Sequence, residues 1–140
     1  MKNETIENIH ISSEKVLITP LELKQEMPLN AKGQQFIANS RTTIADIIHG
    51  KDSRLLVVTG PCSIHDLKSA KEYALKLKKL HDELKDEMYL VMRIYFEKPR
   101  TTVGWKGLLN DPKMDGSFDV ESGLRQGREL LLWLAELELP

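Results

Sequence analysis

The chain is 140 residues long, with 41% hydrophobic and 29% charged residues, as is ordinary for one globular domain with its own core. Its 20 basic and 21 acidic residues leave a net charge of −1, so composition provides no bulk attraction to nucleic acid or to an anionic membrane. A single cysteine excludes an internal disulfide, and neither a signal-peptide core nor a stretch of about 18 apolar residues occurs, so we expect a cytoplasmic protein that binds neither nucleic acid nor membrane.

The first part of the chain, residues 1–52, is expected to be an extension that precedes the main fold. Residues 9–17 alternate loosely between polar and apolar and predict a short strand or an ordered arm. Thr19, Pro20 and Glu22 then form a helix start, with a hydroxyl cap, a proline at the first position and a glutamate at the third.

The rest of the chain predicts strands that alternate with helices. Residues 55–58 form a continuous apolar run closed by turn residues, which is typical of a parallel strand buried on both faces. The other elements expected are a helix over 32–49, a helix over 67–84 capped by Asp66, a strand over 89–95, a loop over 96–118 and a helix over 123–137. Such an alternation predicts an α/β protein.

Cys62 follows the first of these strands, at the end where βα proteins collect ligands. A cysteine in this position is most often a small buried residue. Its functional alternatives are a metal-binding thiolate and a nucleophile paired with a base such as His65. The spacing of the residues does not decide among the three.

A cluster of cations follows the second strand. Arg93, Lys98 and Arg100 lie within eight positions, and Thr101 adds a hydroxyl donor. Arginine offers a planar fork, and lysine a compact charge, for carboxylate or phosphate oxygens. The alternative is a solvated charged loop in which Glu97 pairs with one cation. On chemistry alone the cluster favours binding of an anion such as a phosphorylated metabolite.

Together the two clusters resemble signature segments of the class I 3-deoxy-D-arabino-heptulosonate 7-phosphate (DAHP) synthases. The matching segments are residues 60–66 (GPCSIHD) and 92–107 (MRIYFEKPRTTVGWKG), and residues 110–112 (NDP) and 115–118 (DGSF) continue the match. The resemblance implies an α/β (β/α)8 TIM-type barrel, of which residues 53–140 would be the first βα units. A complete barrel needs about 250 residues. We therefore expect an incomplete barrel that is inactive alone; the alternative is a non-catalytic binding or regulatory fragment.

The resemblance also implies an activity and a set of site residues. Family members condense phosphoenolpyruvate with erythrose 4-phosphate to DAHP and phosphate, the first step of the shikimate pathway to the aromatic amino acids. Cys62 would be a ligand of one divalent metal ion (Mn, Fe, Co or Zn). The residues expected to bind phosphoenolpyruvate are Arg93 and the catalytic Lys98, and those expected to bind erythrose 4-phosphate are Lys98, Pro99, Arg100 and Thr101.

The extension is similar to one that microbial members carry before the barrel. In the family that extension takes part in subunit contacts and in feedback inhibition by an aromatic amino acid, so a homo-oligomer is expected for the full-length enzyme. Residues 8–11 and 17–24 resemble the tyrosine-sensitive group more than the phenylalanine- or tryptophan-sensitive ones.

Overall fold

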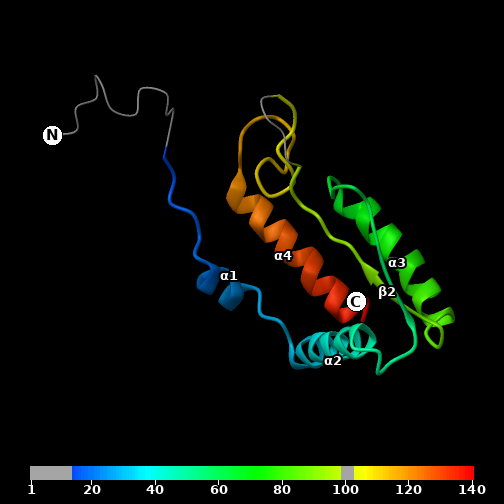
Figure 1. Ribbon diagram of the computed structural model, residues 1–140. Coiled ribbons are helices and arrows are strands. Elements are labelled where there is room, and N and C mark those ends of the chain that lie inside the picture. The colour runs from blue at the N-terminus through cyan, green and yellow to red at the C-terminus, as the bar shows by residue number, and fades with distance from the viewer. Residues whose placement is uncertain (1–13, 99–102) are drawn as a thin grey trace, which may run out of the picture.

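The computed structural model describes residues 14–98 and 103–140, whose helices and strands alternate largely as predicted (Figure 1). The elements in chain order are α1 (Pro20–Glu26), α2 (Ala31–Ile48), β1 (Leu55–Thr59), α3 (Leu67–Glu83), β2 (Met88–Met92) and α4 (Val120–Glu136). Residues 14–19 contain no strand, and the rest of the predicted arm lies outside the described residues. No helix in the described part is long and apolar enough to span a membrane.

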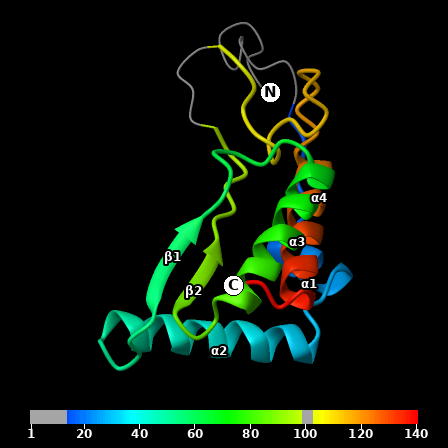
Figure 2. The ribbon, with the colours of Figure 1, turned by 90° about the vertical axis from the view of Figure 1, so that its right-hand side faces the viewer.

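The strands β1 and β2 pair in parallel, from Leu55 with Met88 to Thr59 with Met92. A parallel pair requires a crossover connection, which α3 supplies. Figure 2 shows α3 and α4 beside the strands and α2 running across the end at which β1 begins. The buried core joins α3, β2 and α4 through Ala74, Leu90 and Leu130.

The prediction that the first strand is buried on both faces is wrong for this chain. Leu55 and Val58 on β1 are 58% and 60% exposed. The sheet has only the two strands β1 and β2 in the described residues. Two strands leave β1 at an open edge, where its apolar side chains cannot all be covered.

The two largest differences between predicted and observed element boundaries have local reasons. The second strand ends at Met92 because β1 ends at Thr59, and the last link between them is the bond from Arg93 N to Thr59 O at 2.7 Å. Helix α4 begins three residues early because Asp119 caps it and accepts a bond from Ser122 N. Bonds from Ser122 and Lys113 lower the pKa of Asp119 to about 2.

Both predicted helix caps are confirmed. The Thr19 hydroxyl accepts from Glu22 N at 3.2 Å while the Glu22 carboxylate accepts from Thr19 N at 2.9 Å, which completes a capping box. The Asp66 carboxylate accepts from the backbone of Lys68 and Ser69 at the start of α3. These caps set where two helices begin, independently of tertiary packing.

The short helix α1 is held to α4, although none of its residues is buried. Arg128 on α4 donates twice to Met27 O, at 3.0 and 2.8 Å. Arg125, one turn earlier, forms an ion pair with Glu26 and a second with Glu121. The segment predicted as an extension therefore lies against the last helix.

His81 makes the stability of this fold depend on pH. Its ring is half-buried between α3 and β2, with Nδ1 3.1 Å from Leu90 O and an edge contact to the Tyr89 ring. Desolvation by burial lowers the pKa of His81 below its usual value. The unfolded chain therefore binds the proton more readily than the folded chain. This contribution to stability is present above the unfolded pKa of about 6.5 and is lost as pH falls.

We expect the free energy of unfolding in urea to fall between about pH 7.5 and about pH 5.5, and to fall less in His81→Gln, which does not titrate there. Urea titrations of both chains at the two pH values check this. His49→Gln is the control because His49 is exposed. Equal pH dependence in the wild type and His81→Gln would contradict the assignment.

Candidate functional site

The loops that follow β1 and β2 meet at the carboxyl ends of the two strands. Gly60 makes the approach close, because a Cβ built there would lie 2.3 Å from Arg93 O. Cys62 and Lys98, 36 positions apart in sequence, come together here with 2.9 Å between Sγ and Nζ. Three of the predicted site residues, Cys62, Arg93 and Lys98, thus share one surface.

Arg93 links the second strand to the Cys62 loop. Its Nη1 donates to Pro61 O at 2.9 Å and to Cys62 O at 3.1 Å, and its guanidinium carbon lies 4.8 Å from the centre of the Tyr95 ring. The residue remains exposed. A guanidinium carries five N–H donors, so Arg93 can hold this loop and bind an anion at the same time.

Lys98 is carried by a short backbone hairpin. Glu97 pairs with Gly107 in an antiparallel bridge, and Leu108 N donates to Phe96 O at 2.8 Å. Gly107 has φ +108, and a Cβ there would lie 2.4 Å from Phe96 O, so the hairpin requires glycine at this position. The pairing limits where the neighbouring Lys98 side chain can reach.

Cys62 is exposed, so the interpretation as a small buried residue is wrong. A cation beside a cysteine sulfur stabilises the thiolate, which is the form that acts as metal ligand or nucleophile. The Lys98 ammonium at 2.9 Å is such a cation. The arrangement therefore favours the two functional alternatives over the structural one.

The described residues do not form a complete metal site. Within residues 14–98 and 103–140, no three His, Cys, Asp or Glu side chains lie together in a way that could hold a metal ion. A protein metal site of the kind that uses cysteine takes three or four protein ligands. Cys62 can supply one thiolate, and a complete site would need ligands from outside the described residues.

The other residues expected to bind substrate are not described by the structure, and two neighbouring residues of the same loop have a structural role. Pro99, Arg100 and Thr101 lie outside the described residues. Trp105 packs against the buried core, and its Nε1 donates to Asp111 O at 2.6 Å. Asp111 itself is buried and was not among the predicted site residues. Its only signal in the sequence is its place in the segment 110–112 of the family resemblance.

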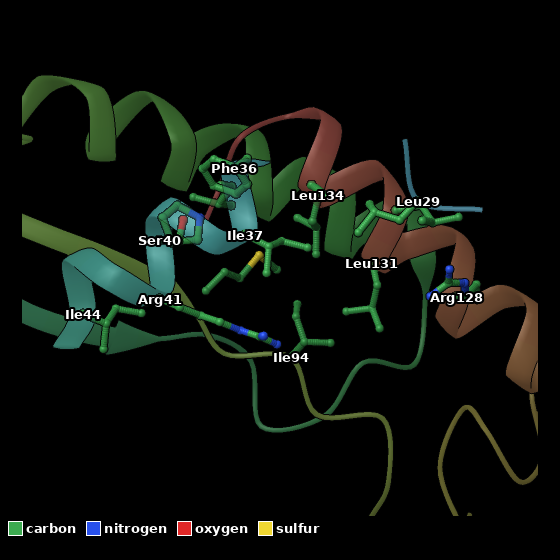
Figure 3. A pocket seen from close by; sticks show the side chains of 15 residues that line it. Leu29, Phe36, Ile37, Ser40, Arg41, Ile44, Ile94, Arg128, Leu131 and Leu134 are labelled. Atoms are coloured by element: carbon green, nitrogen blue, oxygen red, sulfur yellow. The ribbon is translucent and has the colours of Figure 1, made fainter. Parts of the chain in front are cut away.

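A separate apolar cavity of about 350 Å³ lies between α2, α4 and the end of β2 (Figure 3). Arg41 reaches into it toward Ile94, and Leu131 and Leu134 line the α4 side. The last residue, Pro140, also lines it and accepts a bond from Met92 N at 2.6 Å. The cavity holds none of the three clustered site residues, so it is not part of their surface.

The sequence of the chain matches a known protein family along most of its length. The model of the DAHP synthetase I family matches residues 19–137. The chain is 59% identical over 140 residues to the Tyr-sensitive phospho-2-dehydro-3-deoxyheptonate aldolase of Escherichia coli (strain K12), and 52% identical over 134 residues to the Phe-sensitive one. These matches cover 100% and 96% of this chain. They confirm the resemblance inferred from the two signature segments.

A solved structure supports the same relationship. The phospho-2-dehydro-3-deoxyheptonate aldolase of Francisella tularensis SCHU S4 aligns with a TM-score of 0.88 and 49% identity over 93% of this chain. The chain spans only 38% of that protein and 39% of the Tyr-sensitive relative. Because the family model matches most of the chain, the chain belongs to the DAHP synthetase I family.

Proposed function

We propose that the loops after β1 and β2 form one wall of the active site of a DAHP synthase, which condenses phosphoenolpyruvate with erythrose 4-phosphate. The observation that carries the proposal is the meeting of Cys62, Arg93 and Lys98 at two paired strand ends. The relatives' names as phospho-2-dehydro-3-deoxyheptonate aldolases support the same activity. Because the chain spans 39% of the Tyr-sensitive relative, the other walls would come from the remaining length.

In this proposal Arg93 and Lys98 act on the anionic groups of phosphoenolpyruvate. Both substrates carry phosphate, so they repel each other unless fixed cations offset that repulsion. Arg93, already held against the Cys62 loop, presents a rigid fork, and Lys98 presents a point charge beside it. Lys98 is the proposed catalytic residue, because a cation in a fixed position stabilises charge that develops on the reacting phosphoenolpyruvate.

The remaining site assignments extend this wall. Pro99, Arg100 and Thr101 follow Lys98 directly and would bind erythrose 4-phosphate. Cys62 would supply one thiolate to a divalent metal ion, with the other ligands from the remaining length of the enzyme. The adjacent cation supports the thiolate form of Cys62.

We also propose that β1 and β2 are the first strands of a (β/α)8 barrel and that residues 1–52 form an extension before it. The parallel pairing, the α3 crossover and the exposed Leu55 and Val58 support further strands beside this sheet. Exposed Val16 and Leu21 in the extension suit subunit contacts in a homo-oligomer. The higher identity to the Tyr-sensitive than to the Phe-sensitive relative of E. coli supports feedback inhibition by tyrosine.

A chimera tests the proposed activity. These 140 residues would replace the matched 39% of the Tyr-sensitive E. coli relative, and DAHP formation from the two substrates would be measured with a divalent metal present. We expect the chimera to make DAHP and the 140-residue chain alone to make none, because the chain carries only one wall and one metal ligand.

The unmodified relative serves as the positive control for the assay. A folded but inactive chimera would contradict the proposed function and favour a non-catalytic binding or regulatory fragment. Turnover by the 140-residue chain alone would contradict the assignment of the missing walls.

A further inference from the structure

We propose that Asp111 is a positioning residue for the hairpin that places Lys98 beside Cys62. Asp111 is not proposed to touch the substrate. It acts on Lys98 through the backbone of the loop between β2 and α4. The proposal rests on the proposed function only in treating Lys98 as a substrate contact. The placement of Lys98 by Asp111 is a separate claim with its own test.

Asp111 is the centre of a set of hydrogen bonds inside that loop. The whole residue is only 5% exposed. Its N–H donates to Gly107 O at 3.0 Å, and its carbonyl accepts from Trp105 Nε1 at 2.6 Å and from Met114 N at 3.2 Å. Its carboxylate Oδ2 accepts from Gly116 N at 3.1 Å. One residue thus joins both halves of the loop.

The buried carboxylate is costly, which indicates a specific role. Oδ1 of Asp111 is buried without a hydrogen-bond partner within the described parts of the chain. Burying a polar atom without a partner is unfavourable, so it persists in a fold where the other bonds of the same residue offset the cost. The bond from Oδ2 closes the turn over residues 111–116, in which Met114 has φ 55 and Gly116 has φ 75. The carboxylate therefore holds a turn whose backbone conformation is itself unfavourable for methionine.

The turn connects to the site through Gly107. Gly107, which accepts from Asp111 N, also pairs with Glu97 in the hairpin. Lys98 follows Glu97 directly, and its Nζ lies 2.9 Å from Cys62 Sγ. A change in the 111–116 turn is therefore expected to shift Gly107, and with Gly107 the hairpin and the Lys98 ammonium.

The reactivity of Cys62 reports on this placement, because Cys62 is the only cysteine of the chain. We expect iodoacetamide to alkylate Cys62 of the folded 140-residue chain at least about threefold more slowly in Lys98→Ala, since the cation that stabilises the thiolate is removed. Asp111→Ala is expected to lower the rate nearly as much. Asp111→Asn keeps an oxygen that can accept from Gly116 N and is expected to stay near the wild-type rate.

The matched control is Asp86→Ala, an exposed aspartate in the turn between α3 and β2, which should leave the rate unchanged. Circular dichroism establishes that each variant is folded. A role in stability alone would lower the melting temperature without slowing alkylation in the folded chain. If Asp111→Ala does not fold, Asp111→Glu, which displaces the oxygens by one methylene, is compared with Asp111→Asn.

Slow alkylation in Asp111→Ala or Asp111→Glu, with a near wild-type rate in Asp111→Asn, is the expected result. The proposal would be overturned by a wild-type alkylation rate in the folded Asp111→Ala variant, or in Asp111→Glu if that variant takes its place. A wild-type rate in Lys98→Ala would also overturn it. The outcome does not depend on turnover, so an inactive chimera would remove the proposed function and leave this inference standing.

Discussion

Replacing Arg93 or Lys98 by alanine in the chimera is expected to lower kcat/KM for phosphoenolpyruvate by at least about 100-fold, the loss typical when a fixed charge-stabilising donor is removed. Arg93→Ala carries a second effect, because the same guanidinium donates to Pro61 O and Cys62 O. Steady-state kinetics with phosphoenolpyruvate as the varied substrate measure both losses. Arg93→Lys keeps the charge without the fork and is expected to recover only part of the activity.

Lys79→Ala is the control for these variants. Lys79 is a surface lysine on α3, 81% exposed at its side chain, and its pairing with Glu83 lies within the same helix. Its removal should leave kcat/KM unchanged. A loss below about threefold in either Arg93→Ala or Lys98→Ala would show that the cation cluster is a solvated loop and not a binding wall.

Gly60→Ala is expected to destabilise the chain by about 3 kcal/mol, at the upper end of the usual cost of overpacking. The added Cβ would lie 2.3 Å from Arg93 O, and that contact is with backbone, which cannot move aside as a side chain can. The carboxyl ends of β1 and β2 would have to separate, and the Cys62 loop would move away from Lys98. Urea unfolding measures the stability, and the chimera carrying Gly60→Ala should also lose activity.

Gly50→Ala provides the comparison. Gly50 has φ 70, and no atom lies within 4 Å of the position that an added methyl group would occupy, so alanine there costs only backbone strain of about 1 kcal/mol. Equal losses in Gly50→Ala and Gly60→Ala would contradict the close approach of the two strand ends.

Local signals in the sequence account for much of the fold. Thr19 and Asp66 cap their helices through bonds to the following backbone, an interaction that depends on residues two or three positions away. The burial of β1 could not be predicted in the same way. An apolar run such as 55–58 indicates that a strand suits burial, but the number of neighbours that cover it depends on strands and helices outside the run.

In the candidate site, too, one part could be predicted from the sequence and another could not. Parallel pairing brings consecutive strand ends together, so the grouping of Cys62 with the Arg93 segment follows from the predicted βα order. The 2.9 Å contact between Cys62 and Lys98 depends on the hairpin through Gly107, and the role of Asp111 depends on a turn with left-handed residues. Such loop conformations arise from interactions that residue spacing does not reveal.

The most direct test of the central claim is a crystal structure of the active chimera with phosphoenolpyruvate and Mn²⁺. We predict that Arg93 and Lys98 both lie within hydrogen-bond distance, about 3 Å, of phosphoenolpyruvate oxygens and that Cys62 Sγ coordinates the metal. Phosphoenolpyruvate bound at another surface, with Arg93 and Lys98 in solvent, would contradict the assignment of this wall to the active site.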